Sequence, residues 1–180
     1  MSRHVDFSDL TGWDLPAEPF VKLVQAVLAR EGVEGSLSLA LVDEDTIVEL
    51  NQRDRDEDGP TDVLSFAYGD EEEWPELEWA AIDEASGNPS QYEAVGKKDL
   101  PAELSRQDLG EVVICPAVVE RYAAEEGNTL AYQLGWTVVH GVLHLLGYDH
   151  EDDNGEMRVR ERELLSELKE VIESLVPSDS

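Results

Sequence analysis

The sequence predicts an α+β fold with about four strands and about five helices. Residues 36–41 alternate in period two, which is typical of a half-buried strand. Apolar residues between Phe20 and Leu28 recur at spacings of three and four, which is typical of a helix with one buried face. At 180 residues and 41% hydrophobic content, the chain can bury one sizeable core but is short for two. We therefore expect residues 1–180 to form a single domain.

The first half of the chain predicts three strands and two helices. Pro16 suits the first turn of a helix, and Gly32 stands where that helix should end. Asp43 or Asp45 is expected to cap a second, short helix that ends near Leu50. The expected strands are residues 3–7, 36–41 and 63–66.

A polar loop is expected at residues 50–62, directly before the strand at 63–66. It ends in Gly59-Pro60 followed by Thr61-Asp62. A charged loop at the end of a strand is a common place for functional residues. Its composition alone, however, favours a solvated turn.

The second half predicts one strand and three helices. The β-branched run at 109–114 is a strand that Cys115 ends, and we interpret this cysteine as a small buried hydrophobe. Pro116 opens a helix that Gly127 closes, and Asn128 is expected to cap the next helix. The remaining expected elements are helices at 129–146 and 156–175 and an acidic surface insertion at about 70–107.

The charge of the chain is extreme. Forty-two Asp and Glu residues against 13 Lys and Arg residues give a formal net charge of −29. Nucleic-acid-binding proteins normally carry a basic surface, so this charge argues against a nucleic-acid partner in general. We expect no DNA partner. The first residues lack the apolar run of a secretory signal, and no stretch approaches the roughly 18 apolar residues of a membrane span. We expect a cytoplasmic protein with no membrane association and, because Cys115 is the only cysteine, no internal disulfide.

Three of the four histidines fall within residues 140–150. His140 and His144 are four residues apart, so on a helix they project from one face. Gly147 can end that helix at positive φ and turn His150 back toward the first two imidazoles. Three converging imidazoles predict an open divalent-metal site. The alternatives are histidines of the core and a closed structural metal site.

The residue after the first histidine distinguishes this pattern from a peptidase. The spacing of the three histidines and the glycine matches that of the metzincin peptidases. Those enzymes place a glutamate directly after the first histidine, as the general base. Here that position is Gly141, which cannot take a proton. Peptide hydrolysis by that route is therefore not expected.

Three segments resemble the bacterial YbeY family of metal-dependent endoribonucleases. Leu50-Asn51, Arg55 and residues 60–66 match the family signature LN…R…PTDVLSF. Residues 109–115, LGEVVIC, resemble the strand LGDIVIC, and residues 140–150 match HGxLHLLGYDH without a gap. The likeness covers about residues 1–69 and 108–176. It departs from the family at Asp54, where an aromatic residue is usual, and in the length of the 70–107 insertion.

The resemblance implies a fold, a site and an activity. The fold is a small mixed sheet covered by helices, with the metal site on a helix and the turn after it. His140, His144 and His150 are the metal ligands, for one Zn²⁺ per chain, although other divalent metals also fit. Arg55 is implied in activity and in contacting RNA. The implied role is cleavage of single-stranded RNA in ribosomal RNA processing, at the 3′ end of the small-subunit RNA, and in ribosome quality control. The implied partner is the small ribosomal subunit.

Two other functions are compatible with the same residues. One is a metallopeptidase whose general base comes from elsewhere, with Glu111 as the candidate. The other is a non-catalytic module bound to the ribosome, in which zinc only holds the fold. In that second case a fourth protein ligand, Asp149 or Cys115, would close the site.

The net charge predicts that salt stabilises this protein. A solvated acidic surface repels itself, and at molar salt the Debye length falls to about 3 Å, which screens that repulsion. The melting temperature should therefore rise between low and molar KCl, as expected for a protein of a salt-rich cytoplasm. Thermal melts across a KCl series measure this, and an unchanged or lower melting temperature would contradict it.

Overall fold

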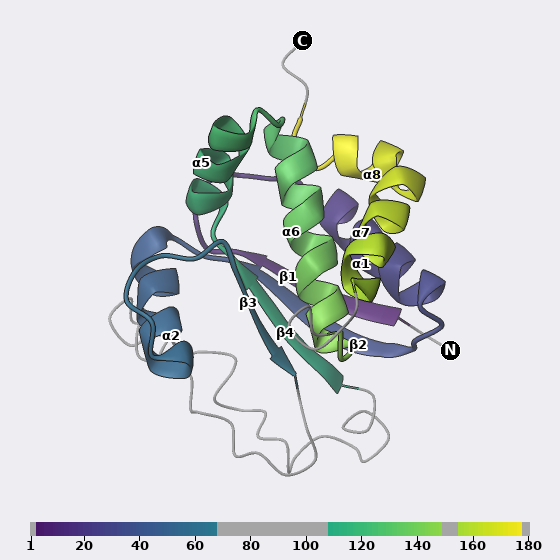
Figure 1. Ribbon diagram of the computed structural model, residues 1–180, viewed down its shortest axis with the longest axis horizontal. Helices are drawn as coiled ribbons and strands as arrows, with labels where there is room; N and C mark the ends of the chain where they lie inside the picture. The colour runs from purple at the N-terminus through teal and green to yellow at the C-terminus, as the bar shows by residue number, and fades with distance from the viewer. Residues whose placement is uncertain (1–2, 68–107, 149–154, 178–180) are drawn as a thin grey trace. The chain divides into compact units, whose positions relative to one another are not determined.

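The four strands form one mixed sheet, which confirms the predicted α+β class. The computed structural model describes residues 3–67, 108–148 and 155–177, and the predicted insertion at 70–107 lies outside this part. The strands lie side by side in the order β1-β2-β4-β3 (Figure 1). Their bounds are β1 Arg3–Asp9, β2 Gly35–Leu41, β3 Val63–Ala67 and β4 Asp108–Ile114.

The two outer pairs of the sheet run in different senses. β1 and β2 are parallel, with Val5 opposite Leu37, and the chain between them forms a helix, as a parallel connection requires. β3 and β4 are antiparallel, with Val63 opposite Ile114. The first residue of β3 thus lies beside the last residue of β4. Just beyond this pair, the backbone N–H of Cys115 donates to the Asp62 carbonyl at 2.9 Å.

Helix α6 lies at the centre of the helical layer. It packs against β3 and against the helices α1, α5, α7 and α8 (Figure 1). Most of its residues are buried, including Leu134, Val138, Val142 and Leu143 at 0% exposure. Each such side chain contributes about 1.5–3 kcal/mol by leaving water. The described helices are α1 Ala17–Arg30, α2 Glu44–Arg55, α5 Pro116–Glu126, α6 Leu130–Leu145, α7 Glu156–Glu167 and α8 Lys169–Glu173.

Two glycines let α6 approach its neighbours closely. A Cβ at Gly141 would lie 2.8 Å from Cγ1 of Val112 and 3.1 Å from Cγ2 of Val63, both on the sheet. The Ser65 hydroxyl donates to the Gly141 carbonyl at 2.9 Å, so the contact is also polar. On another side of α6, a Cβ at Gly135 would lie 2.5 Å from Cγ2 of Ile172 in α8. At these two points the backbone of α6 therefore packs directly against side chains of its neighbours, with no α6 side chain between them.

Helix α2 is longer than the sequence predicts. Asp43 caps it as expected, because its carboxylate accepts the Thr46 N–H at 2.9 Å. The helix continues through Arg55 and ends at Asp56, which has a left-handed φ of 53°. The prediction of a loop from Leu50 was thus wrong. Asn51 is 3% exposed and its amide donates to the Gly59 carbonyl at 3.0 Å, which ties the helix to the returning chain.

The N-cap of α6 is Thr129, not the predicted Asn128. The Thr129 hydroxyl accepts the Tyr132 N–H at 3.1 Å. Asn128 instead completes the end of α5, because its N–H donates to the Ala123 carbonyl at 2.8 Å. Gly127, with φ of 73°, closes α5 as predicted.

The predicted final helix is broken into α7 and α8. Leu168 has φ of −106° and ψ of 19°, which departs from helical values. After the break, Ile172 reaches α6 at Gly135. This break accounts for six helices in the described residues where about five were expected.

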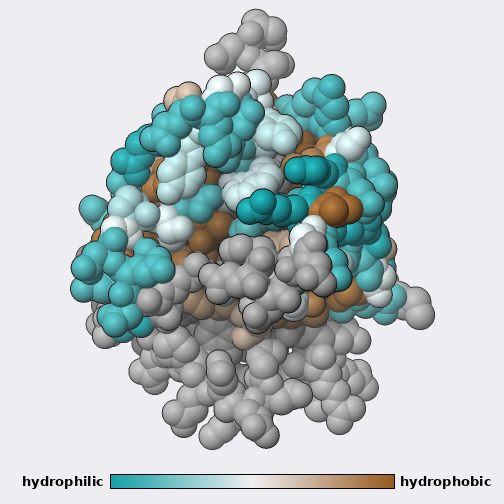
Figure 2. Space-filling model, viewed as in Figure 1, coloured by the Kyte–Doolittle hydropathy of each residue, from teal (hydrophilic) through white to brown (hydrophobic). Residues whose placement is uncertain are grey.

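Hydrophilic residues cover α2, α5 and α7 on the face drawn in Figure 2, and hydrophobic residues show mainly between the helices. Large exposed hydrophobic side chains in the described residues are few: Leu10, Trp13, Tyr132 and Val159. In this part of the chain no helix has both the length and the apolar character needed to cross a membrane.

The Gly141 contact predicts a cost for a single methyl group. Alanine favours helices over glycine by about 1 kcal/mol, but Gly141→Ala places its Cβ against Val112, so we expect a net loss of about 1–3 kcal/mol of stability. Adding Val112→Ala removes the nearest obstructing carbon. The double variant should then be more stable than the sum of the two single effects predicts. Denaturant titration measures all three, and a stabilised Gly141→Ala would contradict the contact.

Candidate metal centre

His140 and His144 bring two imidazole nitrogens together on α6. Their Nε2 atoms lie 3.1 Å apart, and both side chains are half-buried. Two nitrogen ligands at 2.0–2.1 Å from one tetrahedral ion would be separated by about 3.3 Å. The rings meet edge to face, with centroids 4.5 Å apart and an angle of 79°. The spacing and the donor atoms therefore fit two ligands of one divalent metal ion.

The ring of His140 is held on two further sides. Its Nδ1 lies 2.6 Å from Oε1 of Glu161, which comes from α7. Trp136, one helical turn earlier on α6, stacks on the imidazole with centroids 4.7 Å apart and an angle of 21°. The Glu161 side chain is 8% exposed and that of His140 is 18% exposed. The carboxylate–imidazole pair is thus shielded from solvent.

Helix α6 ends just before Gly147, as the sequence predicts. Gly147 has φ of +99° and donates its N–H to the His144 carbonyl at 3.1 Å. Tyr148 donates its N–H to the Leu143 carbonyl at 3.1 Å, which completes a Schellman motif. His150 lies outside the described residues, so its role as third ligand stays a prediction.

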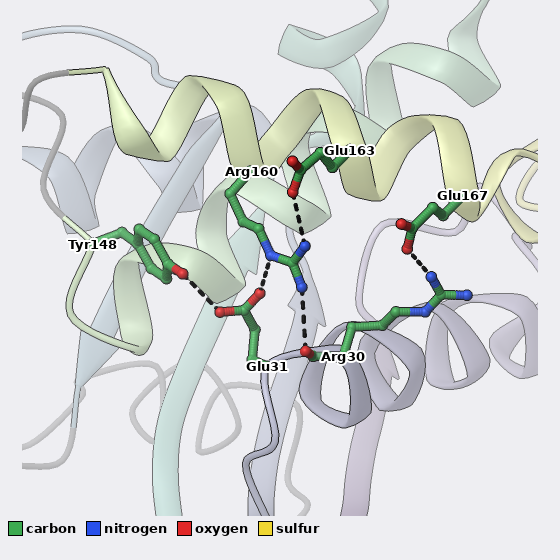
Figure 3. A network of polar contacts seen from close by, with 6 residues as sticks. All are labelled: Arg30, Glu31, Tyr148, Arg160, Glu163 and Glu167. Atoms are coloured by element: carbon green, nitrogen blue, oxygen red, sulfur yellow. Dashed lines mark hydrogen bonds and ion pairs between the residues drawn. The ribbon is translucent and has the colours of Figure 1, made fainter.

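A half-buried carboxylate joins the segments on either side of residues 149–154 (Figure 3). Glu31, at the end of α1, accepts the Tyr148 hydroxyl at 2.8 Å and is paired with Nε of Arg160 in α7. Arg160 also donates to Glu163 at 2.9 Å and to the Arg30 carbonyl at 3.2 Å. The hydrogen bond to Glu31 raises the pKa of the Tyr148 hydroxyl, with burial adding to the effect. One side chain of α1 therefore fixes both Tyr148 and α7.

Gly141 leaves no room for a peptidase base. Gly141 holds the position that carries glutamate in the metzincins, and it faces the sheet. A Cβ at this position would lie 3.4 Å from the Ser65 hydroxyl oxygen and closer still to the side chains of Val112 and Val63. Glu111, the alternative base, lies on β4 opposite Phe66 and is 4% exposed.

Of the other predicted site residues, only Cys115 lies fully within the part of the chain that the structure describes. Arg55 is the last residue of α2, but its side chain lies outside the described part, as does Asp149. Cys115 is fully buried, and burial raises the pKa of its thiol, which disfavours a thiolate ligand. Within residues 3–67, 108–148 and 155–177, no three His, Cys, Asp or Glu side chains converge as a metal site. His150, the predicted third ligand, lies outside these ranges, so the three-histidine site stays a prediction.

Sequence reasoning missed Glu161, Trp136 and Asp62. Burial raises the pKa of the Asp62 carboxyl, and the electrostatic attraction of His140 partly opposes this rise. The signal for Glu161 was present in the sequence. It stands on the apolar stripe of its helix between Met157 and Leu164, where a charged residue needs a partner.

Comparison with known proteins shows which family this chain resembles. The family model "Endoribonuclease YbeY" matches residues 12–169. The chain belongs to the YbeY family. Family members named "Endoribonuclease YbeY" include those of Mycolicibacterium vanbaalenii, 35% identical over 91% of this chain and 79% of the relative, and Nocardia farcinica, 35% identical over 92% and 80%. The Mycolicibacterium smegmatis member is 34% identical over 91% and 82%.

The fold is also similar to a solved structure. The solution structure of a Thermotoga maritima protein aligns with a TM-score of 0.53 and 26% sequence identity, over 92% of each chain. The predicted resemblance to the YbeY family is therefore confirmed.

Proposed function

We propose that this protein is a metal-dependent endoribonuclease that cleaves single-stranded RNA. The observation that carries the proposal is the 3.1 Å approach of the His140 and His144 Nε2 atoms in a chain of the YbeY family. The relatives' name supports RNA as the substrate class. In the proposal His150 supplies the third ligand and Zn²⁺ is the ion, because three imidazoles with an open position form a common catalytic zinc site.

The proposal assigns residues to metal binding and to phosphate binding. A divalent ion at such a site can lower the pKa of a water molecule and offset negative charge on a phosphate. His140 and His144 hold that ion from the rigid helix α6. Arg55, at the end of α2, binds a phosphate through the fork of its guanidinium. With a net charge of −29, the protein depends on these few cations to accept a polyanion.

The biological role follows the family. We propose that the substrate is ribosomal RNA, processed at the 3′ end of the small-subunit RNA in the cytoplasm, with a further role in ribosome quality control. A peptidase is disfavoured because Gly141 packs against Val112 on the sheet. Cleavage of RNA would also separate this proposal from a non-catalytic module stabilised by zinc.

Removing one ligand should abolish metal binding and cleavage together. We expect His144→Ala to lose bound metal and to cleave single-stranded RNA no faster than the parent protein treated with a chelator. His4→Ala is the matched control, because His4 lies on β1 with a 66% exposed side chain. Metal analysis of both variants beside an RNA cleavage assay measures this. A metal-free His144→Ala that still cleaves RNA would contradict the site.

Removing Arg55 should lower cleavage without changing the metal content. Losing a charge-assisted hydrogen bond to phosphate costs about 1.5–3 kcal/mol, which corresponds to roughly a 10- to 100-fold slower cleavage. Arg53→Ala is the control, since Arg53 is exposed on the same helix two residues earlier. If Arg55→Ala cleaves as fast as the parent, the assignment of Arg55 is wrong.

A further inference from the structure

Glu161 is a buried acid whose position needs an explanation. It is 6% exposed and shares the inward stripe of α7 with Met157, Leu164 and Leu168. Burying a carboxylate among apolar side chains costs several kcal/mol unless a partner offsets it. Its contact with Nδ1 of His140, at 2.6 Å, is such a partner.

We propose that Glu161 is a positioning residue that fixes the tautomer and the ring orientation of His140 for metal binding. This rests on the metal centre proposed above. A carboxylate only accepts hydrogen bonds, so Nδ1 of His140 must donate to it. In the neutral imidazole the lone pair is then on Nε2. That atom is the one that lies 3.1 Å from Nε2 of His144.

The surroundings allow His140 only one useful orientation. Trp136 stacks on the face of the imidazole, and His144 meets it edge to face. Stacking fixes the plane of the ring but not whether Nε2 or Cε1 points toward His144, because a half-turn about the Cβ–Cγ bond keeps the same plane. The hydrogen bond to Glu161 distinguishes the two orientations. Carboxylates that bind the second nitrogen of a ligand histidine typically contribute 10- to 100-fold in metal affinity.

The position of Glu161 is itself fixed by contacts on another side of α7. The neighbouring residue, Arg160, points toward α1, where it is paired with Glu31 and donates to the Arg30 carbonyl (Figure 3). Arg30 also forms an ion pair with Glu167, about two turns further along α7. Adjacent helical residues project in different directions, so Arg160 faces α1 while Glu161 faces α6. Helix α7 therefore holds the carboxylate against His140.

Zinc affinity tests the proposal without relying on activity. Zn²⁺ would be titrated into the metal-free full chain against a chromophoric chelator for the parent, Glu161→Gln, Glu161→Ala and His144→Ala. The control is Glu170→Gln, which makes the same charge change at an exposed position on α8, outside the contacts of Arg160. We expect both Glu161 variants to bind Zn²⁺ about 10- to 100-fold more weakly than the parent and Glu170→Gln to stay within about twofold.

Each outcome decides between the two proposals. If His144→Ala loses Zn²⁺ binding and Glu161→Gln keeps the parent's affinity, the metal centre stands and the role of Glu161 is overturned. If His144→Ala binds Zn²⁺ like the parent, the metal centre fails and the role of Glu161 fails with it.

The tautomer of His140 is a second measurement, and in the parent protein it tests the proposal even if the Glu161 variants fold poorly. Long-range ¹H–¹⁵N spectra of the metal-free parent should show His140 as the Nδ1–H tautomer, and those of Glu161→Gln should show a mixture. An Nε2–H tautomer in the parent would overturn the proposal.

Discussion

The contact between α6 and the sheet at Gly141 is the constraint on which the site depends. Without a side chain at this position, the helix backbone lies against Val112 and Val63, and the Ser65 hydroxyl binds the Gly141 carbonyl. This contact fixes the rotation of α6 about its own axis. His140 and His144 are thereby turned to the side of the helix, where α7 can reach His140. The glycine that replaces the peptidase base is thus the residue that places the helix carrying His140 and His144 against the sheet.

The side chains around His140 come from helices that are distant in sequence but are connected to one another by polar contacts. Glu161 reaches His140 from α7, and α7 is fixed to α1 through Arg160 and Glu31. Glu31 also accepts the hydroxyl of Tyr148, which directly precedes residues 149–154. Two arginines, Arg30 and Arg160, thus link α1 to α7 beside the proposed site. In our proposal the metal ion and Arg55 are the cations that contact the phosphate.

Local patterns in the sequence predicted most of the fold and part of the site. All four strands, the cap at Asp43 and the turn at Gly147 depend on short-range spacing, backbone sterics and capping, and all were predicted. The predictions failed where the deciding contact is non-local or where two caps compete. Helix α2 extends past Leu50 because Asn51 bonds Gly59, and Thr129 rather than Asn128 begins α6 because Asn128 ends α5. Glu161 pairs with a histidine on another helix, and no periodic pattern encodes that pairing.

X-ray absorption at the metal edge of the zinc-loaded protein tests the central claim most directly. Our account predicts three imidazole nitrogens at about 2.0–2.1 Å and a remaining light-atom ligand from solvent. His144→Ala should lose one imidazole contribution or the metal itself. A sulfur ligand at about 2.3 Å, which would indicate Cys115, or a site closed by four protein ligands would contradict an open three-histidine centre.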